Sequence, residues 1–271
     1  MPWLLAQISD LHVGTPAGGV IDTAPYVAAA VGHLNELDPQ PHLVLASGDL
    51  AESGDGPSYA RLAELLAPLH APVVLLAGNH DERSALRAAF PSQPWSAGDE
   101  RLCGVVEGDV RLVLLDSVIP GRPGGRLGAA QIEWLDEVLA AAPERPTIVA
   151  LHHPPFRTGI AHMDAMGLED APELAVVIER HRHVHAVLCG HLHRPICRRW
   201  AGTIAMTVPS VAHQVALDLR PDAPVSFAME PPAVALHLWQ DGAGLVSHLS
   251  PIGHWPTLVL AETPAASPQE T

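Results

Sequence analysis

Five short clusters of potential metal ligands occur between residues 10 and 193. In chain order they are Asp10-Leu11-His12, Gly48-Asp49, Gly78-Asn79-His80-Asp81, His152-His153 and Gly190-His191-Leu192-His193. Their donor atoms are carboxylate and amide oxygens and imidazole nitrogens. This donor set suits Mn, Fe, Zn or Co better than a metal that prefers thiolates.

Taken together, the clusters supply seven side chains that can donate to a metal: Asp10, His12, Asp49, Asn79, His152, His191 and His193. Seven donors are too many for one catalytic ion, which must keep a position open for substrate. Two ions fit, with one carboxylate shared between them. Two metal ions roughly 3.5–4 Å apart stabilise the entering and leaving oxygens of a displacement at phosphorus. The donor set therefore predicts hydrolysis of a phosphate ester.

Each cluster directly follows an apolar run that predicts a buried strand. The runs cover residues 4–8, 43–46, 73–77, 148–151 and 186–189. In open α/β sheets, ligands bind at the carboxyl ends of the strands, so these positions are where a site is expected. A further hairpin is predicted from residues 105–106 and 110–115, with Gly108-Asp109 at its turn.

Helical spacing of apolar residues separates the strands. The predicted helices are 26–37, 59–69, 83–90, 131–142 and 172–179. Beyond His193 the pattern is mainly β, with strands predicted at 203–208, 213–219, 233–239 and 244–249. The alternation predicts an α/β fold with two facing sheets flanked by helices.

The order of the five clusters resembles that of the calcineurin-like metallophosphoesterase superfamily, over residues 4 to 193. Five elements in the right order are much more specific than any one of them. The contexts Ser9-Asp10-Leu11-His12, His152-His153-Pro154-Pro155 and Cys189-Gly190-His191-Leu192-His193 are similar to the bacterial class III cyclic nucleotide phosphodiesterases and the related glycerophosphodiesterases. The resemblance implies a four-layer αββα sandwich of two facing mixed sheets.

The resemblance also implies a role for each ligand. The first metal would be held by Asp10, His12, Asp49 and His193, and the second by Asp49, Asn79, His152 and His191. Asp49 would bridge the ions, together with a hydroxide that acts as the nucleophile. His80 would stabilise the transition-state charge or protonate the leaving oxygen, and Asp81 would orient His80.

Segments that follow the last histidine clusters are expected to border the substrate. The predicted substrate-binding residues are Asn79, His80, His193, Phe156, His162, Asp164 and His213. Consecutive side chains of an extended segment point to opposite sides, so only one of His152 and His153 faces the metals, and we assign a structural role to His153. The run His181-Arg182-His183-Val184-His185 follows a predicted helix and is interpreted as structural.

Three functions are compatible with these residues. The first is a phosphodiesterase that acts on 3′,5′-cyclic nucleotides, cyclic AMP above all. The second keeps the chemistry but acts on a glycerophosphodiester such as glycerophosphoethanolamine, with broad tolerance for other diesters. The third is a non-catalytic metal-binding scaffold, which would be expected to have lost ligands or His80. All seven ligands and His80 are present.

The composition limits the partners. A net charge of −15, with only 15 Lys and Arg residues, argues against a nucleic-acid polymer as ligand, because phosphate backbones are bound mainly by basic side chains. Two divalent ions can still attract a small phosphodiester locally. The three cysteines form no even framework, which predicts a reducing, cytoplasmic environment. The sequence has no run of eighteen apolar residues, so no membrane span is expected.

We expect one domain over residues 1–261, with a β-rich C-terminal part that begins at about residue 196. The proline-rich segment 221–232 is either an ordered cap with Phe227 and Met229 as apolar anchors, or a flexible surface loop. Residues 262–271 are predicted to form a flexible tail. The family analogy suggests a homo-oligomer, either a dimer or a larger assembly.

Overall fold

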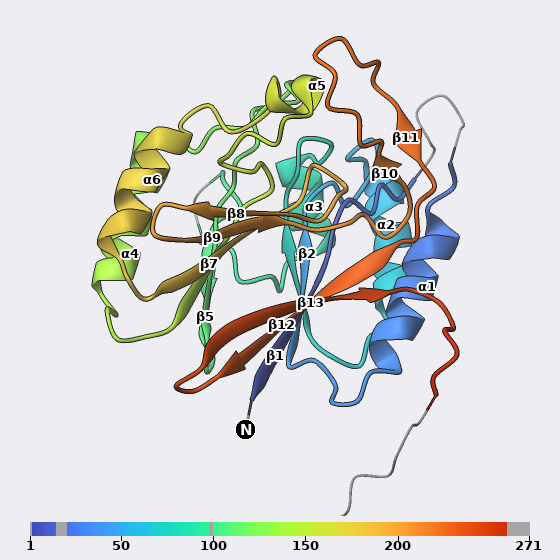
Figure 1. The fold of residues 1–271 in the computed structure, drawn as a ribbon, viewed down its shortest axis with the longest axis horizontal. Helices are drawn as coiled ribbons and strands as arrows, with labels where there is room; N and C mark the ends of the chain where they lie inside the picture. The colour runs from blue at the N-terminus through green and yellow to red at the C-terminus, as the bar shows by residue number, and fades with distance from the viewer. Residues whose placement is uncertain (1, 15–20, 98–99, 259–271) are drawn as a thin grey trace, which may run out of the picture.

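A computed structural model of the chain describes residues 2–14, 21–97 and 100–258. The predicted tail, 262–271, lies outside these residues. Two mixed sheets form the centre of the molecule (Figure 1). The first sheet has the strand order β13 (Gly244–Pro251), β12 (Ala233–Gln240), β1 (Trp3–Ile8), β2 (Leu43–Ser47) and β3 (Val73–Leu76). Strands β1, β2 and β3 are parallel, whereas β12 and β13 are antiparallel to their neighbours.

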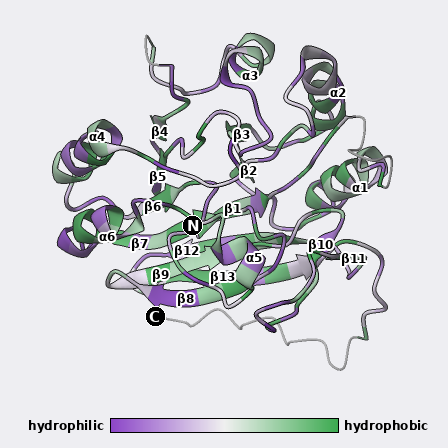
Figure 2. Cartoon of the chain, turned by 90° about the horizontal axis from the view of Figure 1, so that it is seen from above, coloured by the Kyte–Doolittle hydropathy of each residue, from purple (hydrophilic) through white to green (hydrophobic). Residues whose placement is uncertain are grey.

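The second sheet is built in the same way. Its order is β4 (Gly104–Val106), β5 (Arg111–Leu114), β6 (Thr147–Ala150), β7 (Val184–Cys189), β9 (Thr203–Thr207) and β8 (Ile196–Trp200). The four central strands are parallel, and the two edge strands are antiparallel. The edge strand β8 carries exposed Arg198 and Arg199, and its arrowhead end is coloured as hydrophilic in Figure 2. Charges on an edge strand discourage pairing with another chain.

Helices cover the outer face of each sheet. Helices α1 (Ala24–Asn35), α2 (Gly56–Leu66) and α3 (Arg83–Ala89) lie against the first sheet, and α4 (Ala129–Ala140) and α6 (Ala171–Arg180) lie against the second (Figure 1). The short helix α5 spans Ala161–Asp164. A separate apolar cluster fills the space between the sheets, with Leu5, Leu45, Leu112 and Leu188 among its members. The four layers of the predicted αββα sandwich are thereby confirmed.

The C-terminal part differs from the prediction in two places. The strand expected at 213–219 is only Gln214–Val215 (β10), and it pairs with Phe227–Ala228 (β11). Leu217 and Leu219 are exposed, so no core contact holds them in a longer strand. Strand β8 was not predicted, because its basic residues give it no apolar alternation. No helix of the described residues is long and apolar enough to cross a membrane.

The proline-rich segment 221–232 is part of the β10–β11 hairpin. The Ala216 amide donates to the Ser226 carbonyl (2.9 Å), and Arg194 Nη1 lies 2.9 Å from Glu230 Oε2. Of the two alternatives, the structure therefore supports the ordered cap. Figure 1 shows the hairpin as a projection beyond the ends of both sheets.

A buried polar network joins the two sheets. Gln7 donates through Nε2 to Ser47 Oγ (2.8 Å) and to the Cys189 carbonyl (3.1 Å), which belongs to the other sheet. Gln7 Oε1 accepts from His237 Nε2 (3.0 Å), and His237 Nδ1 lies 2.8 Å from Ser247 Oγ. Burial lowers the pKa of His237 to about 4, so this ring is neutral at pH 7.

His237 should make the stability of the protein depend on pH. Its pKa is lower in the folded chain than in the unfolded chain, so the unfolded chain takes up a proton first as the pH falls. The stabilisation is fully present above the unfolded pKa of about 6.5 and is lost as the pH falls towards 4. Between pH 7 and pH 5 the free energy of unfolding should fall by about 2 kcal/mol from this group. Urea unfolding at both pH values should show a smaller loss in His237→Gln than in the wild type. Equal losses in the two proteins would contradict this prediction.

Candidate metal centre

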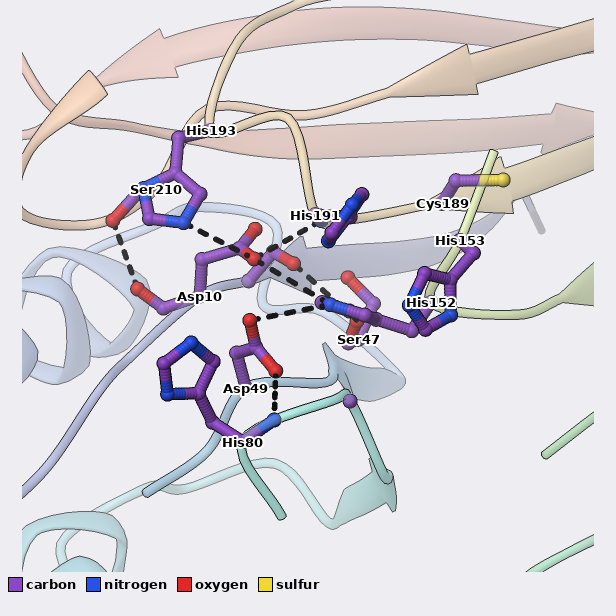
Figure 3. Close-up of polar contacts among 12 residues, drawn as sticks. Asp10, Ser47, Asp49, His80, His152, His153, Cys189, His191, His193 and Ser210 are labelled. Atoms are coloured by element: carbon purple, nitrogen blue, oxygen red, sulfur yellow. Dashed lines mark hydrogen bonds and ion pairs between the residues drawn. The ribbon is translucent and has the colours of Figure 1, made fainter. Parts of the chain in front are cut away.

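The predicted ligands meet where the carboxyl ends of the parallel strands of both sheets come together (Figure 3). Asp10 follows β1, Asp49 follows β2 and Asn79 follows β3, all in the first sheet. His152 follows β6, and His191 with His193 follows β7, in the second sheet. Parallel strands in each sheet bring their carboxyl ends to one edge, and the packing of the two sheets places these edges opposite each other.

The backbone at the site adopts an uncommon conformation. Six non-glycine residues of the described chain have φ in the left-handed region, and five of them are predicted ligands, with φ from 46° to 69°: Asp10, His12, Asp49, His191 and His193. Such conformations cost about 1–3 kcal/mol each and persist only where the surrounding structure enforces them. The backbone strain of the fold is therefore concentrated at residues whose side chains face one another.

Glycines let these turns pack closely. A Cβ atom on Gly78 would collide with the backbone amide and carboxylate of Asp49, and one on Gly48 would collide with the His152 ring. Gly48 also has a φ of 99°, which side chains rarely tolerate. Glycine at these two positions therefore lets a ligand that follows another strand approach closely, Asp49 at Gly78 and His152 at Gly48.

The first group of ligands is buried and compact. Asp10, His12, Asp49 and His193 present one donor atom each, all within 4.8 Å of one another. His12 Nε2 lies 3.7 Å from Asp49 Oδ2, and His193 Nε2 lies 3.4 Å from Asp10 Oδ1. These are the four residues predicted for the first metal.

The hydrogen bonds of two histidines assign their lone pairs. His193 Nδ1 donates to the His213 carbonyl (3.0 Å), and His12 Nδ1 lies 2.7 Å from Glu52 Oε2. With the proton on Nδ1, each neutral ring presents a lone pair at Nε2. These two Nε2 atoms are only 3.2 Å apart, where two lone pairs repel unless a cation lies between them. The arrangement fits a metal ion.

Both predicted sets of ligands contain buried donor atoms without protein partners. Among the described residues, Asn79 Oδ1, His191 Nε2 and Asp10 Oδ2 have no hydrogen-bond partner. A buried polar atom left in this way costs free energy, and metal coordination would remove that cost. His152 donates through Nδ1 to the Ser47 carbonyl (2.8 Å), which leaves its Nε2 directed at Asp49, 3.3 Å from Oδ2.

Asp49 is placed to serve both groups. Its Oδ1 accepts from the His80 amide (2.9 Å), so its orientation is set by the backbone. Its Oδ2 is close to His152 on one side and His12 on the other. The shared position matches the predicted bridging role, and Figure 3 shows this carboxylate between the histidines of the two sheets.

The charges of the site favour a bound cation. Burial opposes ionisation of Asp49, yet His152 and His12 hold its pKa well below the usual range. Burial would lower the pKa of His152, but Asp49 raises it to about 9, and a metal ion at Nε2 would displace the proton that this ring then carries. Burial, followed by the charge of His152, lowers the pKa of His191 to about 3, so this ring is a neutral ligand.

His80 is held differently from the prediction. Its Nδ1 donates to the Glu52 carbonyl (2.9 Å), not to Asp81. The Asp81 carboxylate instead accepts from the amides of Gly78, Leu50 and Ala51 and from the Tyr59 hydroxyl. Asp81 is saturated by these contacts, so it fixes two ligand loops against each other and does not orient His80.

A pocket of about 380 Å³ opens over the ligands. Its lining combines predicted ligands and His80 with an apolar wall formed by Ile21, Met163, Met166, Val225 and Phe227. His213, a predicted substrate contact, also lines it and packs edge-on against Phe227, with ring centroids 4.9 Å apart. The pocket therefore joins a polar, ligand-rich floor to an apolar wall.

Three predicted substrate contacts lie outside the pocket wall. Phe156 belongs to the core cluster between the second sheet and its helices. Asp164 accepts from the amide and hydroxyl of Thr158 and from the Gly159 amide, which closes a loop. His162, on α5, has both ring nitrogens buried and no hydrogen-bond partner among the described residues. Their predicted contact with substrate has no support from this geometry.

The histidines interpreted as structural have contacts of their own. His153 Nε2 donates to the Pro123 carbonyl (3.1 Å), and the Ser117 hydroxyl lies 2.8 Å from Nδ1. His181 Nε2 lies 2.7 Å from Asp136 Oδ1, which links the end of α6 to α4. His181 is bound in this way outside the site, whereas His153 packs against the rings of His152 and His191, with centroids 5.0 and 4.6 Å away, and its own ring nitrogens are engaged by Pro123 and Ser117.

Sequence reasoning missed two kinds of residue. Glu52 contacts both His12 and His80, but its place in the loop three residues after Asp49 carries no motif. The apolar wall comes from segments around residues 21, 163–166 and 225–227, which are far apart in the chain. Two of these residues had a signal: Phe227 as an apolar anchor of the proline-rich segment, and Met163 as an expected substrate contact in the segment after His152-His153-Pro154-Pro155.

The comparisons with known proteins agree with this site. The model of the calcineurin-like phosphoesterases matches residues 4–195, which include all five clusters. The chain belongs to this family. A solved structure of a dimetal phosphatase from Danio rerio superposes on this calcineurin-like phosphoesterase with a TM-score of 0.63 at 15% identity, covering 93% of this chain and 99% of that one. That likeness confirms the predicted fold.

Two curated relatives of this calcineurin-like phosphoesterase carry different names. A probable glycerophosphodiester phosphodiesterase from Arcobacter nitrofigilis is 36% identical over 255 residues, covering 92% of this chain and 93% of that protein. The 3′,5′-cyclic adenosine monophosphate phosphodiesterase of Escherichia coli K12 is 37% identical over 217 residues, covering 78% and 76%. The predicted family is confirmed, and the chain is a metal-dependent phosphoester hydrolase.

Proposed function

We propose that the protein is a two-metal phosphodiesterase that hydrolyses 3′,5′-cyclic nucleotides, cyclic AMP above all. Support for two metals comes from two separate clusters of possible ligands, one with Asp10, His12, Asp49 and His193 and one with His152 and His191, and from Asp49 Oδ2, which lies near His12 and His152. Support for a cyclic nucleotide comes from the apolar pocket wall and from the named activity of the Escherichia coli relative.

Residues of both sheets would hold the metals. The first ion would take Asp10, His12, Asp49 and His193, and the second would take Asp49, Asn79, His152 and His191. Two bound divalent ions would offset charge on the phosphoryl oxygens and bring the pKa of water towards neutrality. Mn, Fe, Zn and Co all accept these donors, and availability often decides between them.

His80 would act on the reacting phosphate. Its Nδ1 proton is committed to the Glu52 carbonyl, and its ring lines the pocket. Nε2 is thus the atom that faces substrate. In the cationic form of the ring, Nε2–H can donate to a phosphoryl oxygen or give its proton to the leaving alkoxide.

The apolar wall is the observation that carries the choice of substrate. Phe227 and two methionines, Met163 and Met166, line the same pocket as the ligands, and the Phe227 ring centroid lies 6.3 Å from that of His193. A purine has two flat faces that pack well on aromatic and thioether side chains. A glycerol head group offers mainly hydroxyls, which would gain little from such a wall. The lining therefore favours a nucleotide.

A glycerophosphodiester is the second candidate. The Arcobacter relative matches 93% of its own length, including the β-rich C-terminal part that supplies Val225 and Phe227. The Escherichia coli relative matches over a shorter stretch. This difference favours a glycerophosphodiester such as glycerophosphoethanolamine as substrate, with a site that accepts different leaving groups.

A direct comparison of substrates tests the proposal. kcat/KM is measured for the Mn-loaded protein on cyclic AMP and on glycerophosphoethanolamine under the same conditions. A higher value for cyclic AMP is expected. A clear preference for the glycerol diester would favour the second candidate. Two tightly bound ions without hydrolysis of either diester, or of an activated aryl diester, would favour the non-catalytic scaffold.

Phe227→Ala should weaken the use of cyclic AMP selectively. Removing an aromatic platform under a purine costs about 1–3 kcal/mol, so kcat/KM should fall about tenfold or more, mainly through KM. Met229→Ala is the matched control, because Met229 is equally exposed on the same segment but does not line the pocket. An equal fall with glycerophosphoethanolamine would argue against nucleotide stacking.

Three further predictions concern the whole molecule and stay predictions. The first is a single domain over residues 1–261, for which the family match to residues 4–195 is partial support. The second is a homo-oligomer, and the third is a cytoplasmic location. Size-exclusion chromatography with light scattering measures the second directly.

A further inference from the structure

Glu52 is a partly buried acid that contacts two histidines of the site. Its side chain is 14% exposed, and Oε2 lies 2.7 Å from His12 Nδ1. Its main-chain carbonyl accepts from His80 Nδ1 (2.9 Å), while Oε2 is 3.9 Å from the same nitrogen. A carboxylate this close to the ligands contributes negative charge and orients the ligand rings. It belongs to neither of the two predicted sets of metal ligands.

The loop around Glu52 is fixed by the backbone. The Glu52 amide donates to the Val13 carbonyl (3.0 Å), and Val13 donates to the Leu50 carbonyl (3.1 Å). The preceding amides, Leu50 and Ala51, donate to the Asp81 carboxylate. Glu52 is thus attached to the same strand-end turn as His12, and the distance between the two residues is set by main-chain contacts.

We propose that Glu52 is a positioning residue that holds His12 with Nε2 free and directed at the first metal, and thereby sets the affinity of that metal. The inference rests on the proposed two-metal function. Glu52 prepares one ligand, His12, and its effect is restricted to one of the two ions.

The Glu52 carboxylate selects the tautomer of His12. An imidazole whose partner is a carboxylate keeps its proton on the nitrogen facing that carboxylate, here Nδ1. Without Glu52 the ring would be free to carry the proton at Nε2, where it would block coordination. A carboxylate bonded to a ligating histidine also raises the basicity of the ligand, and its loss typically costs about 10- to 100-fold in metal affinity.

The effect of the Glu52 carboxylate is selective. His152 is oriented by the Ser47 carbonyl and His193 by the His213 carbonyl, so neither depends on Glu52. His80 is held by the Glu52 main chain, which side-chain substitution leaves in place. Loss of the carboxylate should therefore weaken the binding of one metal and not of the other.

The experiment measures Mn²⁺ binding to the metal-free full-length protein by calorimetric titration. The wild type is compared with Glu52→Gln, which keeps the shape and an amide oxygen, and with Glu52→Ala, which removes both. We expect one of two sites to weaken about 10- to 100-fold in Glu52→Ala and less in Glu52→Gln. The other site should keep its affinity.

Glu64→Gln is the control, because Glu64 is exposed and pairs with Arg61 on α2 (2.7 Å), so it should leave both affinities unchanged. Unchanged affinities in both Glu52 variants would overturn the inference, as would equal weakening of both sites. The proposed function fails differently, if wild-type protein binds two ions and hydrolyses no diester. In that case the affinity comparison still decides the role of Glu52.

Discussion

Asp49→Asn is expected to remove both metals and nearly all activity. Asparagine keeps an oxygen that can accept from the His80 amide. It places an uncharged NH₂ group where Oδ2 faces His152 and His12. An amide donor cannot bridge two cations, so both sites should lose affinity together. Bound metals supply several kcal/mol of transition-state stabilisation, so kcat/KM should fall by about a thousandfold or more. Metal analysis after gel filtration and a diester assay measure the two effects.

Asp55→Asn is a matched control for the loss of an acid near this loop. The Asp55 side chain caps α2 through the Ser58 amide (2.8 Å) and does not face the ligands. Its variant should bind two ions and retain wild-type activity. Two ions bound with wild-type affinity to Asp49→Asn would show that this carboxylate does not bridge, and the assignment of the two metal sets would then be wrong.

His80→Ala is expected to lose catalysis while keeping both metals. The His80 ring lines the pocket and is absent from both predicted ligand sets. Its main-chain amide, which orients Asp49, survives the substitution. Removal of one preorganised donor to a developing negative charge costs about 100- to 1000-fold in kcat. Single-turnover rates together with metal content separate this outcome from a binding defect.

The exposed His70 provides the comparison for His80. His70→Ala should match the wild type in both rate and metal content. An unchanged kcat in His80→Ala would contradict the role assigned to this ring. A loss of metal in His80→Ala would instead mean that the ring, or the turn that carries it, supports coordination.

The metal ligands were predictable because each one is encoded locally. Asp10, Asp49 and His152 follow apolar runs that form buried strands, and glycines mark the turns. The carboxyl ends of parallel strands share one edge of a sheet, so strand order alone brings such residues together. The αββα layers follow from the alternation of strands and helices in the same way.

Parts of the C-terminal region were less predictable. Strand β8 has exposed arginines, and its pairing with β9 depends on the main chain rather than on an apolar pattern. The strand expected at 213–219 shortens to two residues, because its apolar side chains Leu217 and Leu219 meet solvent. Edge positions such as these reflect tertiary context more than local preference.

The sequence by itself was enough to predict the candidate ligands and the chemistry they can support, and to determine the family and the layered fold. Tertiary structure alone decided that Glu52 is the partner of His12, that Asp81 braces two loops instead of orienting His80, and that Phe227 faces the ligands across the pocket. The physical reason is the range of the interactions. A strand followed by a ligand is a local pattern, whereas a hydrogen bond or a pocket wall depends on side chains from distant segments, whose meeting is set by the packing of the whole molecule.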